Sequence, residues 1–154
     1  MVATRYKREQ ILDWLSGIAD PEIPVLTIID LGIVRGVDCS DGVTVALTPT
    51  YSGCPATEVI EQSVVTALEE RGVRDVRIKR VLSPAWTTDW ITEEGRNKLR
   101  VYGIAPPERR DRPVACPRCE SNDTQVVSEF GSTACKASYS CLDCLEPFEY
   151  FKCL

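Results

Sequence analysis

The stretch from residue 116 to residue 144 reads CPRCESNDTQVVSEFGSTACKASYSCLDC. It begins and ends with a C-x-x-C unit, Cys116 to Cys119 and Cys141 to Cys144, and 21 residues separate the two units. A C-x-x-C turn places two thiolates on one side of a tight loop, and two such turns facing each other complete the tetrahedron that Zn²⁺ prefers. The spacing therefore predicts a four-cysteine metal-binding ribbon.

Two further cysteines near the C-terminus, Cys135 and Cys153, have two interpretations. They are either small buried apolar residues or additional metal ligands. Cys135, Cys141 and Cys144 give C-x5-C-x2-C, one residue longer than the plant-type ferredoxin spacing. Zinc is therefore the metal expected in the ribbon, and an iron-sulfur cluster at the same cysteines is the alternative.

The composition of the whole chain of 154 residues limits the kinds of site and function that it can have. Its eight cysteines and the absence of an apolar leader segment favour metal sites in a cytoplasmic protein over a disulfide framework. The chain has no histidine, which excludes a Ser-His or Cys-His catalytic pair. The net charge of -5 argues against general nucleic-acid binding, and no run of about 20 apolar residues predicts a membrane span.

The first half of the chain predicts a small sheet packed by helices. Apolar residues at helical spacing, from Ile11 to Ile18, indicate an amphipathic helix that ends at the proline-rich loop 20–24. Residues 33–38 and 43–50 read as a hairpin around a Ser-Asp-Gly turn.

The elements that follow the hairpin complete this expected sheet. A second helix runs from Pro55 to about Arg71, and residues 75–82 form a strand that returns to the hairpin. A third helix follows Thr92 and ends at Gly103. The predicted fold class is α/β (α+β), a three-stranded sheet packed by helices and followed by a four-cysteine zinc ribbon.

A charged, proline-rich segment, residues 106–113, separates the two parts in this prediction, because it reads as a stiff linker. The expected domains are residues 1–105, this linker, and the ribbon at 114–154. Within the ribbon, short strands are expected over residues 125–130 and 137–140.

Cys54 is a second candidate for chemistry, because it stands at the expected start of a helix, directly before Pro55. Unsatisfied backbone N–H groups and the helix dipole stabilise a thiolate there and lower its pKa. Such a thiolate is both nucleophilic and metal-binding, whereas the plainer interpretation is an inert cap. Cys39, beside a turn, is interpreted as inert.

Three motifs on these elements give a family resemblance. They are Asp20-Pro21-Glu22, Asp30-Leu31-Gly32 and the run from Thr50 to Pro55, which reads TYSGCP. In this order they resemble the SufT-type domain of iron-sulfur assembly factors, over about residues 8 to 82. By themselves, carboxylates such as Asp20, Glu22 and Asp30 are more often solvated loop and cap residues.

Segments further along the chain narrow the resemblance to one subfamily. They are 83–92 (SPAWTTDWIT), 103–107 (GIAPP), 131–137 (GSTACKA) and 146–153 (EPFEYFKC). With these, nearly the whole chain is similar to the PaaD family, the D proteins of the phenylacetyl-CoA epoxidase system.

This resemblance implies a non-catalytic accessory factor that matures the iron sites of the epoxidase during phenylacetate degradation. Its partners would be the [2Fe-2S] reductase or the di-iron oxygenase subunit. Cys54 would bind an iron-sulfur cluster transiently, in a transfer site with Asp20, Glu22, Asp30 and Thr50.

Several alternatives remain at this point. One is an integral, non-catalytic structural subunit of the epoxidase. Another is a zinc-ribbon regulator that binds nucleic acid, although Arg109, Arg110, Arg112 and Arg118 make only a weak basic patch among acidic residues. An enzyme with Cys54 as nucleophile lacks a histidine base. Association into a homodimer is also left open.

Overall fold

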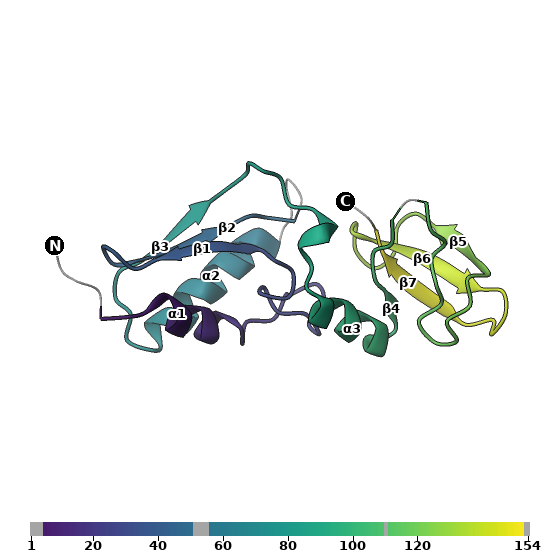
Figure 1. Cartoon of the computed structure of the whole chain (residues 1–154), viewed down its shortest axis with the longest axis horizontal. Coiled ribbons are helices and arrows are strands. Elements are labelled where there is room, and N and C mark those ends of the chain that lie inside the picture. Colours follow the sequence, from purple (N-terminus) through teal and green to yellow (C-terminus); the bar gives the residue numbers. More distant parts are fainter. Residues whose placement is uncertain (1–4, 51–55, 110, 153–154) are drawn as a thin grey trace. The chain divides into compact units, whose positions relative to one another are not determined.

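The computed structural model describes residues 5–50, 56–109 and 111–152. The chain forms two compact units, residues 1–92 and residues 93–154 (Figure 1). Each unit has its own sheet and its own core, and each is described by itself.

The first unit is built around a three-stranded sheet, as predicted. Its elements are α1 (Arg8–Leu15), β1 (Val34–Asp38), β2 (Val43–Leu47), α2 (Ala56–Glu69), β3 (Val76–Arg80) and the 3-10 helix η1 (Thr88–Trp90). The strand order is β1-β2-β3, with β1 antiparallel and β3 parallel to the central β2. The predicted hairpin and the returning third strand are therefore both confirmed.

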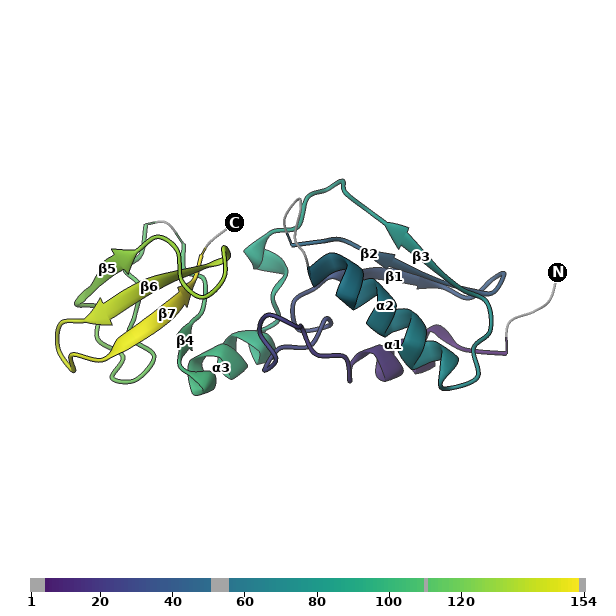
Figure 2. The ribbon, with the colours of Figure 1, turned by 180° about the vertical axis from the view of Figure 1, so that it is seen from behind.

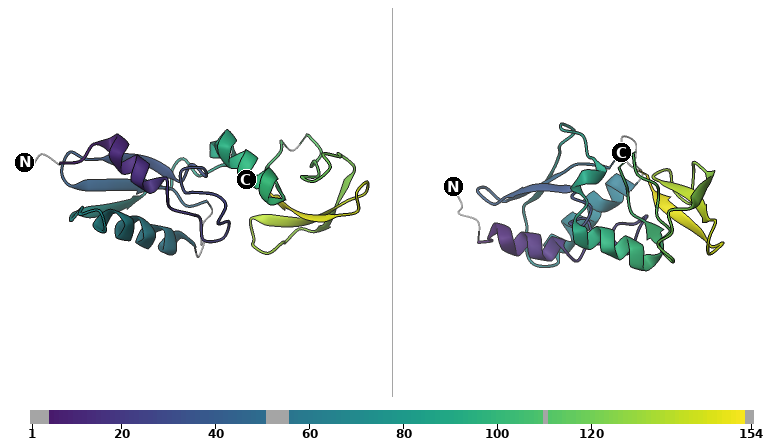
Figure 3. Two further views of the ribbon diagram at one scale, coloured as in Figure 1. Left: turned by 90° about the horizontal axis from the view of Figure 1, so that it is seen from below. Right: turned by 45° about the vertical axis from the view of Figure 1, so that its right-hand side comes forward.

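The core of this unit lies between the sheet and two helices. On β2 the alternate residues Val43, Val45 and Leu47 are buried, which is the period-two pattern of a half-covered strand. Helices α1 and α2 contact each other and lie on the same side of the sheet (Figure 1; Figure 3, left). Helix α2 ends two residues before the predicted Arg71, and Gly72 follows at φ 88°, a left-handed conformation that suits glycine.

The second unit holds a four-stranded sheet (Figure 2). Its elements are α3 (Glu93–Tyr102), β4 (Ile104–Ala105), β5 (Thr124–Ser128), β6 (Lys136–Cys141) and β7 (Pro147–Phe151), in the strand order β4-β7-β6-β5. The predicted ribbon strands correspond to β5 and β6. Sequence reasoning missed β4 and β7. Strand β4 has only two residues, which are too few to show an alternating pattern, and β7 is mostly aromatic and shows no clear alternation of apolar and polar residues.

The division between the units differs from the expected domain limits. The units divide after Thr92, whereas the expected first domain extends to residue 105. Strand β4 pairs in parallel with β7, and Pro106 and Pro107 are buried. The start of the expected linker thus packs as part of the second unit.

A segment near the end of the first unit packs on the Asp30–Gly32 turn. The indole N–H of Trp86 donates to the Leu31 carbonyl at 2.7 Å, and the Thr92 N–H donates to the Asp30 carbonyl at 2.9 Å. Gly32 has φ 70°, and a Cβ built on it would lie 2.5 Å from the Trp90 carbonyl oxygen. The turn therefore requires glycine for both its conformation and its close packing.

Replacing Gly32 with alanine is expected to destabilise the first unit by about 3 kcal/mol, the sum of left-handed strain and a backbone clash. Urea unfolding followed by tryptophan fluorescence measures the loss. Gly36→Ala in β1 is the matched control, because an added Cβ there meets no atom within 4 Å. Equal unfolding midpoints for the two variants would contradict this account of the turn.

Candidate metal centre

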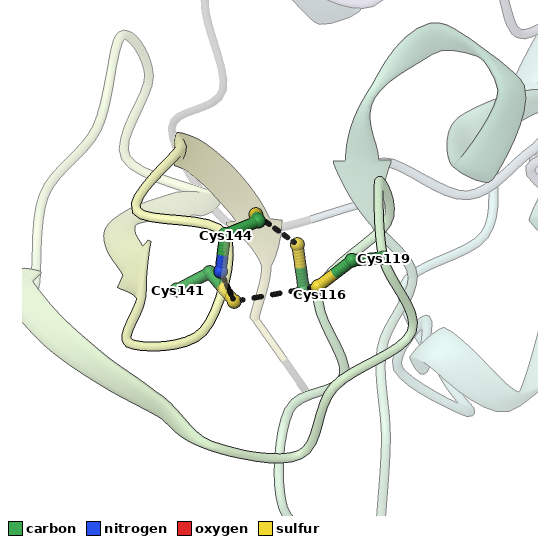
Figure 4. A group of neighbouring side chains, drawn as sticks. All are labelled: Cys116, Cys119, Cys141 and Cys144. Carbon is green, nitrogen blue, oxygen red and sulfur yellow. Dashed lines mark hydrogen bonds between the residues drawn. The ribbon is translucent and has the colours of Figure 1, made fainter.

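Four cysteine thiols converge between two loops of the second unit, which we call the first knuckle (Cys116–Cys119) and the second knuckle (Cys141–Cys144). Their four sulfur atoms all lie within 4.8 Å of one another. Figure 4 shows the sulfurs of each knuckle turned toward those of the other. The structure thus brings together the four residues that the sequence predicted as ligands, and it forms a metal-binding cluster.

The spacing of the sulfurs tests which metal they fit. Two contacts cross between the knuckles, Cys116 Sγ to Cys144 Sγ at 3.8 Å and Cys119 Sγ to Cys141 Sγ at 3.5 Å. Zinc–sulfur bonds of about 2.3 Å in a tetrahedron place sulfur atoms about 3.8 Å apart. The four thiols therefore have the number and type of ligands of a closed tetrahedral site, and the two distances between the knuckles fit a single metal ion such as Zn²⁺.

Both knuckles have the same backbone design. The residue after the second cysteine of each knuckle lies in the left-handed region, Glu120 at φ 64° and Leu145 at φ 66°. The Cys116 N–H donates to the Ser121 carbonyl at 2.8 Å, and the Cys141 N–H donates to the Glu146 carbonyl at 3.0 Å. Each turn is thus closed by a backbone hydrogen bond across its base, which presents both sulfurs on one side.

The knuckles differ from a surface site because one cysteine of each enters the core. Cys116 and Cys141 are buried with Phe148 and Tyr150, whereas Cys119 and Cys144 are exposed. This core is small, and Tyr139 packs against it only partly buried. A core of this size stabilises a fold weakly, so a metal at the knuckles would contribute much of the stability of the unit.

The thiols of the cluster differ in pKa, because their hydrogen bonds and their burial differ. The Cys144 backbone N–H, 3.4 Å from the Cys141 sulfur, is the main cause that lowers the pKa of Cys141 to about 7, against desolvation. At Cys119 a hydrogen bond from the Ser121 backbone lowers the pKa, but desolvation and the neighbouring thiols, Cys116 among them, raise it to about 12. Metal binding must therefore displace protons, and acid should weaken it.

Cys135 lies apart from the four clustered cysteines. It is buried, with its sulfur 3.0 Å from the Thr133 hydroxyl, and its carbonyl accepts a hydrogen bond from the Lys152 N–H. Among the described residues, the group that could hold a metal ion contains only the four knuckle cysteines. Cys153, the other candidate for an additional ligand, lies outside the described residues.

The acidic loop of the first unit is organised by its own carboxylates. The Asp20 carboxylate accepts hydrogen bonds from the N–H groups of Glu22 and Ile23, at 2.9 and 2.8 Å. The Asp30 carboxylate accepts from the Thr27 N–H at 3.0 Å, and the Thr27 hydroxyl accepts from the Asp30 N–H at 3.1 Å. Both aspartates are buried rather than solvated, and their contacts are those of carboxylates that cap their own loops.

Of the remaining residues of the expected transfer site, the structure describes Glu22 and Thr50. Glu22 and Thr50 are both half-buried. Cys54, which the sequence places at a helix start, lies outside the described residues. The roles of these residues in cluster transfer therefore stay a prediction.

Sequence reasoning missed a polar network inside the second unit. Lys136 is buried and its ammonium lies 3.6 Å from the Glu149 carboxylate, which also accepts from the N–H and hydroxyl of Ser132. Desolvation by burial raises the pKa of Glu149, but these hydrogen bonds and the charge of Lys136 outweigh it, so the pKa is lowered overall. The network links β7 to the loop that precedes β6. The one sign of it in the sequence was a single lysine in an otherwise uncharged strand.

Comparison with known families divides the chain in the same way as the two sheets. Residues 8–79 match the family "Iron-sulfur cluster assembly protein", and residues 105–152 match the family "PaaD zinc beta ribbon domain". The second match begins within β4, which agrees with the packing of that strand against β7. In the described part of the chain, every helix is too short or too polar to cross a membrane.

Three known proteins show how far the likeness extends. A Staphylococcus aureus protein named "Fe-S protein maturation auxiliary factor SufT" is 34% identical over 54% of this chain and 98% of its own length. A crystal structure from Bacillus anthracis, a domain of unknown function DUF59, covers 60% of this chain and 90% of its own, with a TM-score of 0.55 and 24% identity, and so shares the fold.

The third relative spans both units. It is the Escherichia coli K12 protein that is named as the D component of a "Putative 1,2-phenylacetyl-CoA epoxidase", 52% identical over 147 residues, 91% of this chain and 89% of its own length. Because this likeness covers the assembly-type unit and the ribbon together, the chain belongs to the PaaD family.

Proposed function

We propose that this protein is a non-catalytic accessory factor that assists the assembly of iron-sulfur clusters or iron sites in a phenylacetyl-CoA epoxidase. The observation that carries the proposal is the combination of two units in one chain. A unit of the iron-sulfur assembly type is joined to a ribbon that matches the PaaD family. A relative with the first unit is named a maturation factor, and a relative with both is named an epoxidase component.

The two units have separate tasks in this proposal. The first unit, with Cys54 as the transient ligand, handles the cluster that is delivered, and Asp20 and Asp30 hold the loop that forms part of the transfer site. The ribbon holds one Zn²⁺ through Cys116, Cys119, Cys141 and Cys144. Support for a single ion is the sulfur spacing, since the thiols of a [4Fe-4S] cluster bind different irons and lie further apart.

A second candidate function is an integral structural subunit, favoured by the name of the Escherichia coli relative. A nucleic-acid regulator has less support, because the ribbon at residues 114–154 carries six acidic residues against one arginine and two lysines. The two leading candidates differ in stoichiometry, since a transient factor leaves the mature enzyme and a subunit remains in it.

Deleting the gene for this chain should separate these candidates. Under the maturation proposal, the di-iron and reductase subunits purified from the deletion strain contain less iron, and restoring the chain restores the iron. The active epoxidase from wild-type cells then elutes without this chain in size-exclusion chromatography. Full iron loading in the deletion strain, with the chain present at fixed stoichiometry in the wild-type complex, would instead establish the structural subunit.

A further inference from the structure

Strand β5 forms one edge of the ribbon sheet (Figure 2). Its one neighbour among the described strands is β6, so the backbone groups along its other side face away from the sheet. Such an edge is a template for pairing with another chain, and proteins usually protect it with charge, proline, a β-bulge or a covering segment. The strand itself reads TQVVS and has no charged residue or proline.

Three apolar side chains on or beside this edge strand are exposed to solvent. Val126 is 54% exposed, Val127 67%, and Phe130 just beyond the strand 68%. The pairing register with β6 shifts between Val126 and Ser128, which leaves Val127 without a partner residue on β6. We call the segment Thr124–Phe130 the β5 edge. Apolar side chains gathered on an open edge mark an interaction surface.

Two carboxylates and one ammonium group lie at the β5 edge, those of Asp123, Glu129 and Lys152. The ribbon at residues 114–154 has six acidic residues against one arginine and two lysines. Lys136 is buried against Glu149, and the Lys152 ammonium lies over the Phe130 ring and donates to the Glu129 carbonyl. Asp123 and Glu129, which flank the strand, are exposed. The surface therefore complements a partner that carries positive charge beside apolar groups.

A second copy of this chain would meet like charges in the pairing register centred on Val126. If two β5 strands paired antiparallel around Val126, Asp123 of one copy would stand opposite Glu129 of the other. Like charges directly opposite each other destabilise a strand pair. The acidic ends of the edge thus disfavour self-pairing in this register and favour a basic partner.

We propose that the β5 edge is the docking site for an extended segment of a phenylacetyl-CoA epoxidase component, a segment with Lys or Arg beside β-branched or aromatic residues. The segment pairs its backbone with β5, its apolar side chains cover Val126, Val127 and Phe130, and its basic groups meet Asp123 and Glu129. The identity of the partner protein rests on the proposed function. The location of the surface rests on the ribbon alone.

Binding of the zinc-loaded full chain to each purified epoxidase component, by isothermal titration calorimetry, tests the proposal. Val127→Lys should raise the Kd at least about tenfold, because it places positive charge at the centre of the edge. Glu129→Lys should raise it about threefold or more, and higher ionic strength should weaken wild-type binding. Leu82→Lys is the matched control, a 69% exposed apolar residue in the first unit, and should stay within about twofold of wild type.

Hydrogen exchange of the wild-type chain gives a measurement that needs no variant. Amides of the β5 edge should become protected when the component binds. Binding that both β5 variants retain, with protection elsewhere, overturns the docking site and leaves the proposed function intact. If the wild-type chain binds no epoxidase component, the docking proposal and the proposed partnership both fail.

Discussion

Cys119→Ser is expected to empty the zinc site and unfold the ribbon while the first unit stays folded. Cys119 is exposed, so its replacement leaves no cavity in the core, and any loss of folding reports the missing metal ligand. Structural zinc binding supplies about 10–16 kcal/mol in zinc-finger peptides, far more than the small core of this unit can replace. The variant should retain less than about a tenth of an equivalent of zinc after gel filtration with a weak chelator.

Two measurements follow the consequence for folding. Limited proteolysis should degrade the second unit of Cys119→Ser, and urea unfolding of the first unit should match that of wild type. Cys135→Ser is the control within the ribbon, because its sulfur lies outside the four-thiol group, and it should keep one equivalent of zinc. A Cys119→Ser protein with full zinc and a protease-resistant ribbon would show that the knuckles do not depend on a metal.

Cys54→Ser is expected to leave the protein folded and to stop its contribution to epoxidase maturation. Serine caps a helix at least as well as cysteine, so the free energy of unfolding should change by no more than about 1 kcal/mol. Serine removes the thiolate, however, and a transient cluster ligand does not tolerate that change. The iron content of the di-iron and reductase subunits, isolated from cells with only the variant, measures the effect.

Growth on phenylacetate gives a second measure, and Cys39→Ser provides the matched control. Cys39 is half-buried directly after β1, and burial is the main cause that raises the pKa of its thiol, which makes it a poor nucleophile or ligand. Cells with Cys39→Ser should therefore grow normally. If cells with Cys54→Ser also yield fully loaded subunits and grow normally, the role of Cys54 as a transient cluster ligand is wrong and the structural-subunit function gains support.

Most of the predicted features that the structure confirms are local ones, and the return of β3 to β2 is the exception. Each knuckle is a turn of a few residues, so the spacing from Cys116 to Cys119 and from Cys141 to Cys144 was enough to predict the four cysteines that cluster. The apolar residues of α2 and the alternation in β2 likewise report which face is buried, because those periods belong to the backbone itself. The hairpin followed from its Ser-Asp-Gly turn.

Other features that depend on distant residues were decided by the tertiary structure alone. Strand β4 is a strand because β7, far along the chain, pairs with it. Gly32 must be glycine because Trp90, far along the chain, packs against its backbone. The sequence by itself determined the two kinds of unit and the four cysteines of the candidate metal centre, since these depend on local spacing. Only the tertiary structure decided where the units divide and which strand edge remains open, because both depend on pairing between segments far apart in the chain.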